Sequence, residues 1–187
     1  MGGYVHIGNV IRFLEEAVAF YLEYNNLNWE PPSNSFGLIC CYVPLFSRSI
    51  GTAITHHCME SLALEYEPDA YFDLNDSLQS SGSEAGMYIH NFVRRYMDFL
   101  PGESYYEYLC FICYICLLCV LAIIFERRDK VYLVILEAAS VLYFSCNHHS
   151  HYINIAQAAI DYNLFHRAVH DESEDDGFFS ASEDEEG

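Results

Sequence analysis

Residues Tyr108–Phe125, YLCFICYICLLCVLAIIF, form an uninterrupted apolar run of about 18 residues. A run of this length either crosses a membrane or forms the central helix of a helical bundle. A second apolar stretch, Val131–Cys146, follows the short charged link 126–130 and carries Glu137 in its middle. Because the link is short, we expect the two stretches to form antiparallel, neighbouring helices.

Amphipathic helices are predicted on both sides of this apolar pair. In the first of them, Asn9 is the expected N-cap, and Asn25 with Asn26 the expected stop. No stretch alternates with the period of a strand, so the predicted class is all-α. The predicted amphipathic ranges are Gly8–Asn25, about Pro44 or Ser47 to Tyr66, Met87–Leu100 and Tyr152–Val169.

Composition bounds the fold and the function. The chain has 187 residues, 52% of them hydrophobic, which is enough apolar material for one packed core. With 27 Asp and Glu against 8 Lys and Arg, the formal net charge is −19, and such a surface repels phosphate backbones, so a nucleic-acid partner is excluded. We expect a helical bundle over residues 1–170 and a disordered acidic tail over residues 171–187.

Histidines and cysteines raise the question of a metal site. A three-residue spacing spreads four thiols around a helix, and we expect them to be small buried side chains of a reduced protein rather than cluster ligands. Neighbouring histidines cannot easily converge on one ion, so no metal and no cofactor is predicted. The residues concerned are Cys110, Cys113, Cys116 and Cys119, and His148, His149 and His151, with His56 and His57 as further imidazoles.

Motifs of catalysis and secretion are also missing from the sequence. It contains no nucleophile elbow, phosphate-binding glycine loop or zinc-protease helix, and we therefore predict a protein that is not an enzyme. The first residues, MGGYVH, lack the basic and apolar regions of a secretory signal. A cytoplasmic location is the corresponding expectation.

The acidic tail carries a pair of aromatic residues. Phe178 and Phe179 follow an acidic tract, with Ser180, Ala181 and Glu183 after them, an order that resembles the FFAT motif. The resemblance implies docking on the VAMP-associated proteins of the endoplasmic reticulum, helped by phosphorylation of Ser180, which restores a negative charge that the motif usually has. The alternative is a tail that only solubilises the protein. Expected phosphorylation sites are Ser173, Ser180 and Ser182.

One region points to a known family. Residues 92–114, FVRRYMDFLPGESYYEYLCFICY, contain a helix that ends near Asp98, a turn at Pro101 and Gly102, and the start of an aromatic-rich apolar helix. This order resembles the first homology region of the Bcl-2 family of apoptosis regulators. The Asp-Phe and Pro-Gly form is most similar to viral members of the family, such as the small early apoptosis inhibitor of adenoviruses. The resemblance implies a Bcl-2-like helical bundle around a central apolar helix.

The resemblance also implies a groove for an amphipathic partner helix, between the second helix and residues 87–105. In cellular members a Gly-Arg pair opens the central helix, and its arginine pairs with an aspartate of the captured helix. Here Gly102 is followed by Glu103, whose charge would repel that aspartate. The residues expected at the groove are Ile54, Cys58, Leu62, Phe92, Tyr96, Phe99, Gly102, Glu103, Tyr105 and Leu109.

Two functions remain open on the sequence. The leading one is a viral-type inhibitor of apoptosis that binds pro-apoptotic Bcl-2 family proteins or another host adaptor, in the cytoplasm or at the surface of the endoplasmic reticulum or mitochondria. The other is a membrane hairpin of the endoplasmic reticulum, formed by Tyr108–Cys146, whose tail recruits a VAMP-associated protein; Glu137 is costly in lipid for that reading. Whether two chains associate through the groove as a homodimer is left open.

Overall fold

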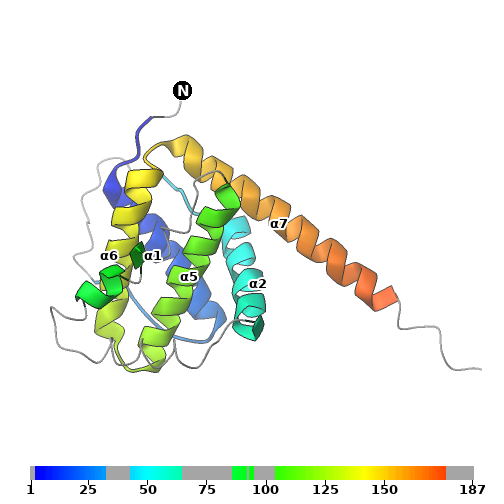
Figure 1. Cartoon of the computed structure of the whole chain (residues 1–187), viewed down its shortest axis with the longest axis horizontal. Helices are drawn as coiled ribbons and strands as arrows, with labels where there is room; N and C mark the ends of the chain where they lie inside the picture. Colours follow the sequence, from blue (N-terminus) through cyan, green and yellow to red (C-terminus); the bar gives the residue numbers. More distant parts are fainter. Residues whose placement is uncertain (1–2, 33–42, 65–85, 92, 95–103, 176–187) are drawn as a thin grey trace, which may run out of the picture.

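All regular secondary structure in the described part of the chain is helical. The computed structural model describes residues 3–32, 43–64, 86–91, 93–94 and 104–175, with no side-chain detail for 59–64 and 170–175. Apart from a single bridge between Tyr4 and His148, no strand pairing occurs within these ranges, which confirms the predicted all-α class. The helices are α1 (Ile7–Tyr24), α2 (Arg48–Leu64), α5 (Tyr105–Ile124), α6 (Arg128–Ser145) and α7 (His149–Asp175), with a short helical segment over 86–94 that is described except at 92 (Figure 1).

Helix α5 lies at the centre of the bundle. It packs against α1, α2, α6 and α7, and Phe111, Ile112 and Ile115 have no exposed surface. A helix covered on all sides needs no polar face. The prediction of a bundle around the apolar helix is therefore confirmed, and the helix begins one turn earlier than expected because Ser104 caps it through a hydrogen bond from the Tyr106 N–H (3.3 Å).

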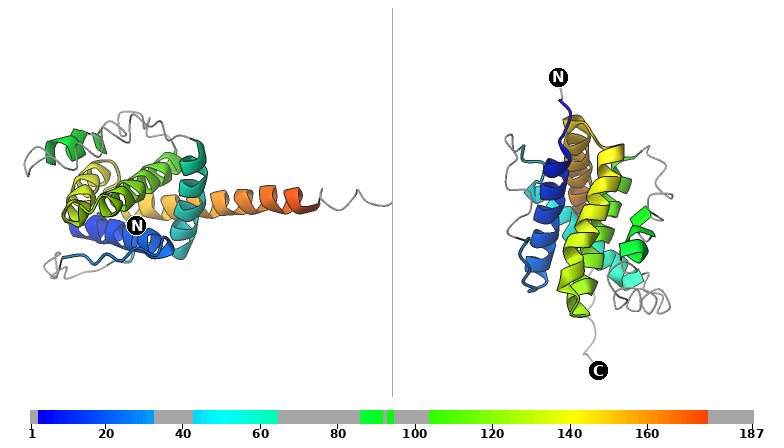
Figure 2. Two further views of the ribbon diagram at one scale, coloured as in Figure 1. Left: turned by 90° about the horizontal axis from the view of Figure 1, so that it is seen from below. Right: turned by 90° about the vertical axis from the view of Figure 1, so that its left-hand side faces the viewer.

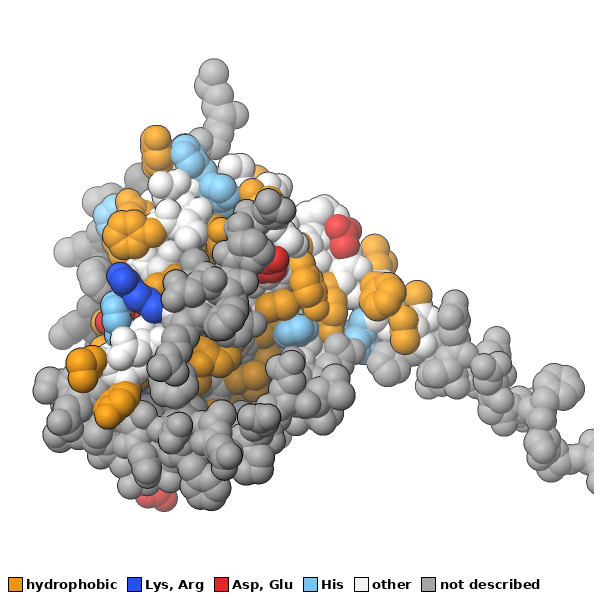
Figure 3. All heavy atoms as spheres, in the orientation of Figure 1, with side chains coloured by type: hydrophobic (Ala, Val, Ile, Leu, Met, Phe, Trp, Pro, Cys, Tyr) orange, Lys and Arg blue, Asp and Glu red, His pale blue; other side chains and the backbone are white. Residues whose placement is uncertain are grey.

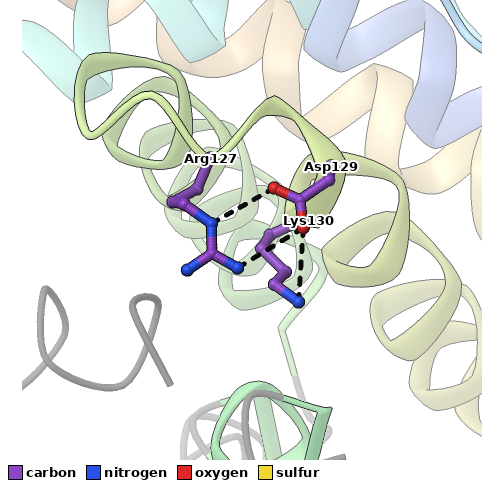
Figure 4. A network of polar contacts seen from close by, with 3 residues as sticks. All are labelled: Arg127, Asp129 and Lys130. Carbon is purple, nitrogen blue, oxygen red and sulfur yellow. Dashed lines mark hydrogen bonds and ion pairs between the residues drawn. The ribbon is translucent and has the colours of Figure 1, made fainter. Parts of the chain in front are cut away.

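Helices α5 and α6 are joined by a short turn and run antiparallel, as predicted (Figure 1). At this turn Asp129 accepts hydrogen bonds from the Arg127 guanidinium (3.2 Å to Nε) and lies 3.3 Å from the Lys130 ammonium (Figure 4). Glu137 is accommodated at the surface of α6, where its carboxylate lies 2.8 Å from the His90 ring.

The ends of α1 follow local hydrogen-bond chemistry. His6, not Asn9, is the N-cap, because its ring Nδ1 accepts a hydrogen bond from the Gly8 N–H (3.1 Å), and the helix starts at Ile7, one residue before the predicted range. Asn9 is instead buried within the first turn. The predicted stop is confirmed: the Asn25 side-chain amide donates to the Tyr21 carbonyl, and Asn26 adopts a left-handed conformation (φ 57°) that ends the helix.

Helix α2 packs its apolar stripe into the core. Ile50, Ile54 and Cys58 have no exposed surface, as their helical spacing predicts. The helix approaches α1 closely at Gly51, where an added Cβ would lie 2.7 Å from the Phe20 ring. Only glycine permits this approach without movement of the aromatic side chain.

Helix α7 leaves the bundle. It packs against α2 and α5, and its later half extends past α2 beyond the other helices (Figures 1 and 2). It continues to Asp175, further than the predicted end at Val169 and into the segment expected to be a disordered tail. Once a helix is formed, each further residue adds a backbone hydrogen bond at little cost, so acidic residues can prolong it.

Candidate functional site

A cleft of about 800 Å³ lies between the first turn of α5 and one flank of α7. Figure 3 shows hydrophobic and acidic side chains next to one another along the exposed part of α7. Aromatic rings form much of the wall of the cleft, and amide and carboxylate groups provide its polar part. The lining residues are Ser104, Tyr105, Tyr106, Asn154, Gln157, Ala158, Asp161, Tyr162 and Phe165.

Two tyrosines on α5 have their hydroxyls held by histidines of other helices. The Tyr105 hydroxyl lies 3.1 Å from Nδ1 of His151 on α7, and the Tyr106 hydroxyl lies 3.3 Å from Nδ1 of His57 on α2. Each hydrogen bond fixes the direction of a ring at the mouth of the cleft. The aromatic wall is thus positioned before any partner arrives.

Three of the α7 residues that line the cleft are spaced four positions apart. Gln157, Asp161 and Phe165 follow one another at the spacing that places side chains on one helical face. The Gln157 amide donates to the Asp161 carboxylate (2.9 Å), which orients the acid. The Tyr162 ring meets the Tyr106 ring at 5.8 Å and 34°, so the aromatic surface is continuous from α5 to α7.

The described part of the cleft is negatively charged. Among the described lining residues, Asp161 is the one acid and none is Lys or Arg. Along the chain, no basic residue occurs between Arg95 and Arg127, a range that includes the α5 side of the cleft. The local field therefore favours a cationic group over an anionic one.

The other flank of α7 has the opposite charge. A smaller hollow of about 420 Å³, between α7 and the start of α2, has two arginines in its lining, Arg48 and Arg167. Asn163, also at this flank, ties the two helices together because its side-chain amide donates to the Ser49 carbonyl (2.9 Å). The rest of this lining is Ser49, Thr52, Ile160, Asn163 and Leu164.

Among the residues predicted for a partner groove, only Tyr105 lies in an open cleft that the structure describes. Ile54, Cys58 and Leu109 have no exposed surface and belong to the core, since α2 and α5 pack these faces against each other. The structure therefore does not place these three on an open groove. Phe92, Tyr96, Phe99, Gly102 and Glu103 lie outside the described residues, as does the side chain of Leu62.

The predicted tail site also lies outside the described residues. This applies to the five docking residues and to two of the three phosphorylation sites, while Ser173 lies on α7 with its side chain not described. The residues outside are Phe178, Phe179, Ser180, Ala181, Ser182 and Glu183.

The cysteines of α5 are core side chains. Cys113, Cys116 and Cys119 are buried and Cys110 is half-buried, as predicted from their place in the apolar run. Burial raises the pKa of all four thiols, and it raises the pKa of Cys146 to about 12. Neutral, covered thiols are poor nucleophiles. Within the described residues, no group of three His, Cys, Asp or Glu side chains is placed to hold a metal ion.

Sequence reasoning missed the α7 side of the cleft. The helical period assigns Asp161, Tyr162 and Phe165 only to an amphipathic helix, although the four-residue spacing of Gln157, Asp161 and Phe165 places these three on one helical face. Their meeting with Tyr106 depends on the approach of two helices far apart in the chain. Such a contact depends on tertiary packing, so the helical period of the sequence does not reveal it.

One described helix, α5, is long and apolar enough to cross a membrane by length and composition, and 67% of its most apolar window is buried inside the bundle. Comparison with known proteins found no matching family model, no matching curated protein and no matching solved structure.

Proposed function

We propose that this chain is a non-enzymatic, Bcl-2-like regulator of apoptosis of the viral, inhibitory type, which binds an amphipathic helix of a pro-apoptotic protein or host adaptor. The observation that carries the proposal is the open, aromatic cleft beside the start of the central helix. Tyr105, which the family resemblance assigned to the partner groove, lines that cleft. Partner helices bind other proteins through apolar anchors at helical spacing, and a preformed aromatic cleft accepts such anchors.

Exposed apolar side chains on α7 further support a binding role. Phe165 is 69% exposed and Leu164 60% exposed, and exposed apolar side chains grouped on one helix are typical of protein interaction sites. The catalytic alternative has no comparable support, because the sequence contains no nucleophile motif and three of the four α5 thiols are buried.

The test is the affinity of the full chain for a panel of pro-apoptotic helix peptides, measured by fluorescence anisotropy. We expect at least one peptide to bind with a dissociation constant below about 1 μM. Phe165→Ala should weaken that binding about tenfold or more, since it removes an exposed aromatic anchor. Phe144→Ala is the matched control, because Phe144 is also exposed (80%) but lies on α6, outside the cleft.

Equal weakening by Phe144→Ala and Phe165→Ala would contradict the proposed site. Absence of binding by every peptide, with the chain helical by circular dichroism, would contradict the proposed function. Tyr105→Ala serves as a second cleft variant, and it should weaken binding without loss of helical signal.

A second candidate function is favoured by the length and apolarity of α5: a membrane hairpin of the endoplasmic reticulum whose tail docks on a VAMP-associated protein. Resistance to carbonate extraction from membranes would support the hairpin over the bundle-based proposal. Tail docking predicts binding of a peptide of residues 171–187, phosphorylated on Ser180, to a VAMP-associated domain. Phe179→Ala in that peptide should abolish the binding, and an unchanged affinity would end the docking idea.

A further inference from the structure

We propose that the cleft between α5 and α7 takes a positively charged side chain, arginine or lysine, from the partner helix. This inference deepens the proposed function and rests on it, because it specifies the chemistry of the partner at the same site. The cleft brings together what binds a cation in water: several aromatic rings and one carboxylate.

Three aromatic rings, those of Tyr106, Tyr162 and His57, meet beside the cleft. Tyr106 and Tyr162 are tilted by 34° at 5.8 Å and form one corner of the cleft, and the His57 ring meets the edges or faces of both at 5.9 Å. A guanidinium or ammonium group over the face of an aromatic ring is attracted by the ring quadrupole. Because hydrogen bonds to His57 and His151 hold the two α5 hydroxyls, the rings need little rearrangement to receive it.

Asp161 supplies the negative charge of the described lining. Its carboxylate is oriented by Gln157 (2.9 Å) and lies in the lining with the aromatic residues. No Lys or Arg among the described lining residues competes for it, and Arg167, the nearest Lys or Arg along α7, belongs to the lining of the other hollow. A partner cation can therefore contact a ring face and a carboxylate at the same time, which an anion or a neutral amide cannot do.

Charge complementarity also selects among partners at long range. The chain carries a formal −19, which steers basic helices toward it and repels acidic ones. That field acts on the whole surface and gives no site. The site-specific prediction is that the carboxylate of Asp161 contributes much more to the affinity for a basic helix than an equal charge elsewhere on the surface.

The test uses three amphipathic helical peptides of identical apolar face whose polar face carries Arg, Gln or Glu. Binding to the full chain is measured by fluorescence anisotropy at moderate salt. We expect the Arg peptide to bind about tenfold more tightly than the Gln peptide, and the Glu peptide more weakly than both. Asp161→Asn should remove most of the Arg preference. Glu23→Gln, which removes one exposed charge from the end of α1, should leave it within about twofold.

A second variant separates the cation–π contribution of an aromatic ring from its apolar contact. Phe165→Leu keeps an apolar side chain but removes the ring, and it should lower the affinity of the Arg peptide more than that of the Gln peptide. Equal affinities for the Arg and Gln peptides, or equal effects of Asp161→Asn and Glu23→Gln, would overturn this inference and leave the proposed function standing. No binding by any of the three peptides or the pro-apoptotic panel would overturn both.

Discussion

Helices α5 and α7 differ in how their side chains are covered. Helix α5 is surrounded by four other helices, and Phe111 in its middle has no exposed surface. Helix α7 packs only one face and presents the remainder, including Phe165 (69% exposed), to solvent. Apolar residues therefore have two environments in this chain: most of those on α5 are buried and stabilise the fold, and those on the outer face of α7 are exposed to solvent.

The largest expected effect comes from the same substitution made on both helices. Phe111→Ala should lower the free energy of unfolding by about 3–5 kcal/mol, since it removes buried ring contacts and leaves a cavity. Phe165→Ala should change it by less than about 0.5 kcal/mol, because the ring is exposed. Urea denaturation followed by circular dichroism measures both values. Similar losses for the two variants would mean that the outer face of α7 is covered in solution, and the comparison would fail.

Part of this division was predictable from the sequence. The sequence narrowed the place of α5 to two alternatives, a membrane span or the centre of a bundle, because an apolar run without a polar face needs apolar surroundings on all sides. The end of α7 was not, since acidic residues such as Asp171 and Glu172 suggest disorder, and a helix that is already formed can continue through them. The cleft was not predictable either, because Tyr106 and Tyr162 are brought together only by packing. The N-cap of α1 was not predictable for a similar reason, because the sequence alone does not show whether His6 or Asn9 accepts the hydrogen bond at the start of the helix.

A smaller effect tests how α7 is attached. Asn163→Ser removes the hydrogen bond from the side-chain amide to the Ser49 carbonyl of α2 and should cost about 1 kcal/mol of unfolding free energy. Serine is chosen because its helix propensity is close to that of asparagine. The control is Gln157→Ser, which removes an amide that bonds only within α7, to the exposed Asp161, and should change stability by about 0.3 kcal/mol or less. A cost no greater than that of the control would show that this bond does not hold α7 to the bundle.

The smallest expected effect lies at the turn after α5 and depends on pH. The hydrogen bond from Arg127, with further help from Lys130, lowers the pKa of Asp129 below its ordinary value of 3.8. A carboxylate with a lowered pKa stabilises the fold at pH values above that ordinary value, and the contribution is lost as the pH falls through the lowered one. Because the Asp129 side chain is 60% exposed, the contribution near neutral pH should stay below about 1 kcal/mol.

Asp129→Asn measures this contribution. The difference in unfolding free energy between the native chain and the variant should be present near pH 7 and should shrink in high salt. It should vanish once the pH has fallen through the lowered pKa of Asp129, because the native carboxylate is then protonated and neutral. A difference that stays constant from neutral to strongly acidic pH would mean that the asparagine acts through helix capping rather than charge. Asp129 lies in the first turn of α6, where a carboxylate also interacts with the helix dipole. Measuring the pH-dependent effect of Asp129→Asn again in an Arg127→Gln background separates this dipole interaction from the ion pair. Only the ion pair with Arg127 requires the guanidinium, so loss of the pH-dependent difference in that background assigns the effect to the pair.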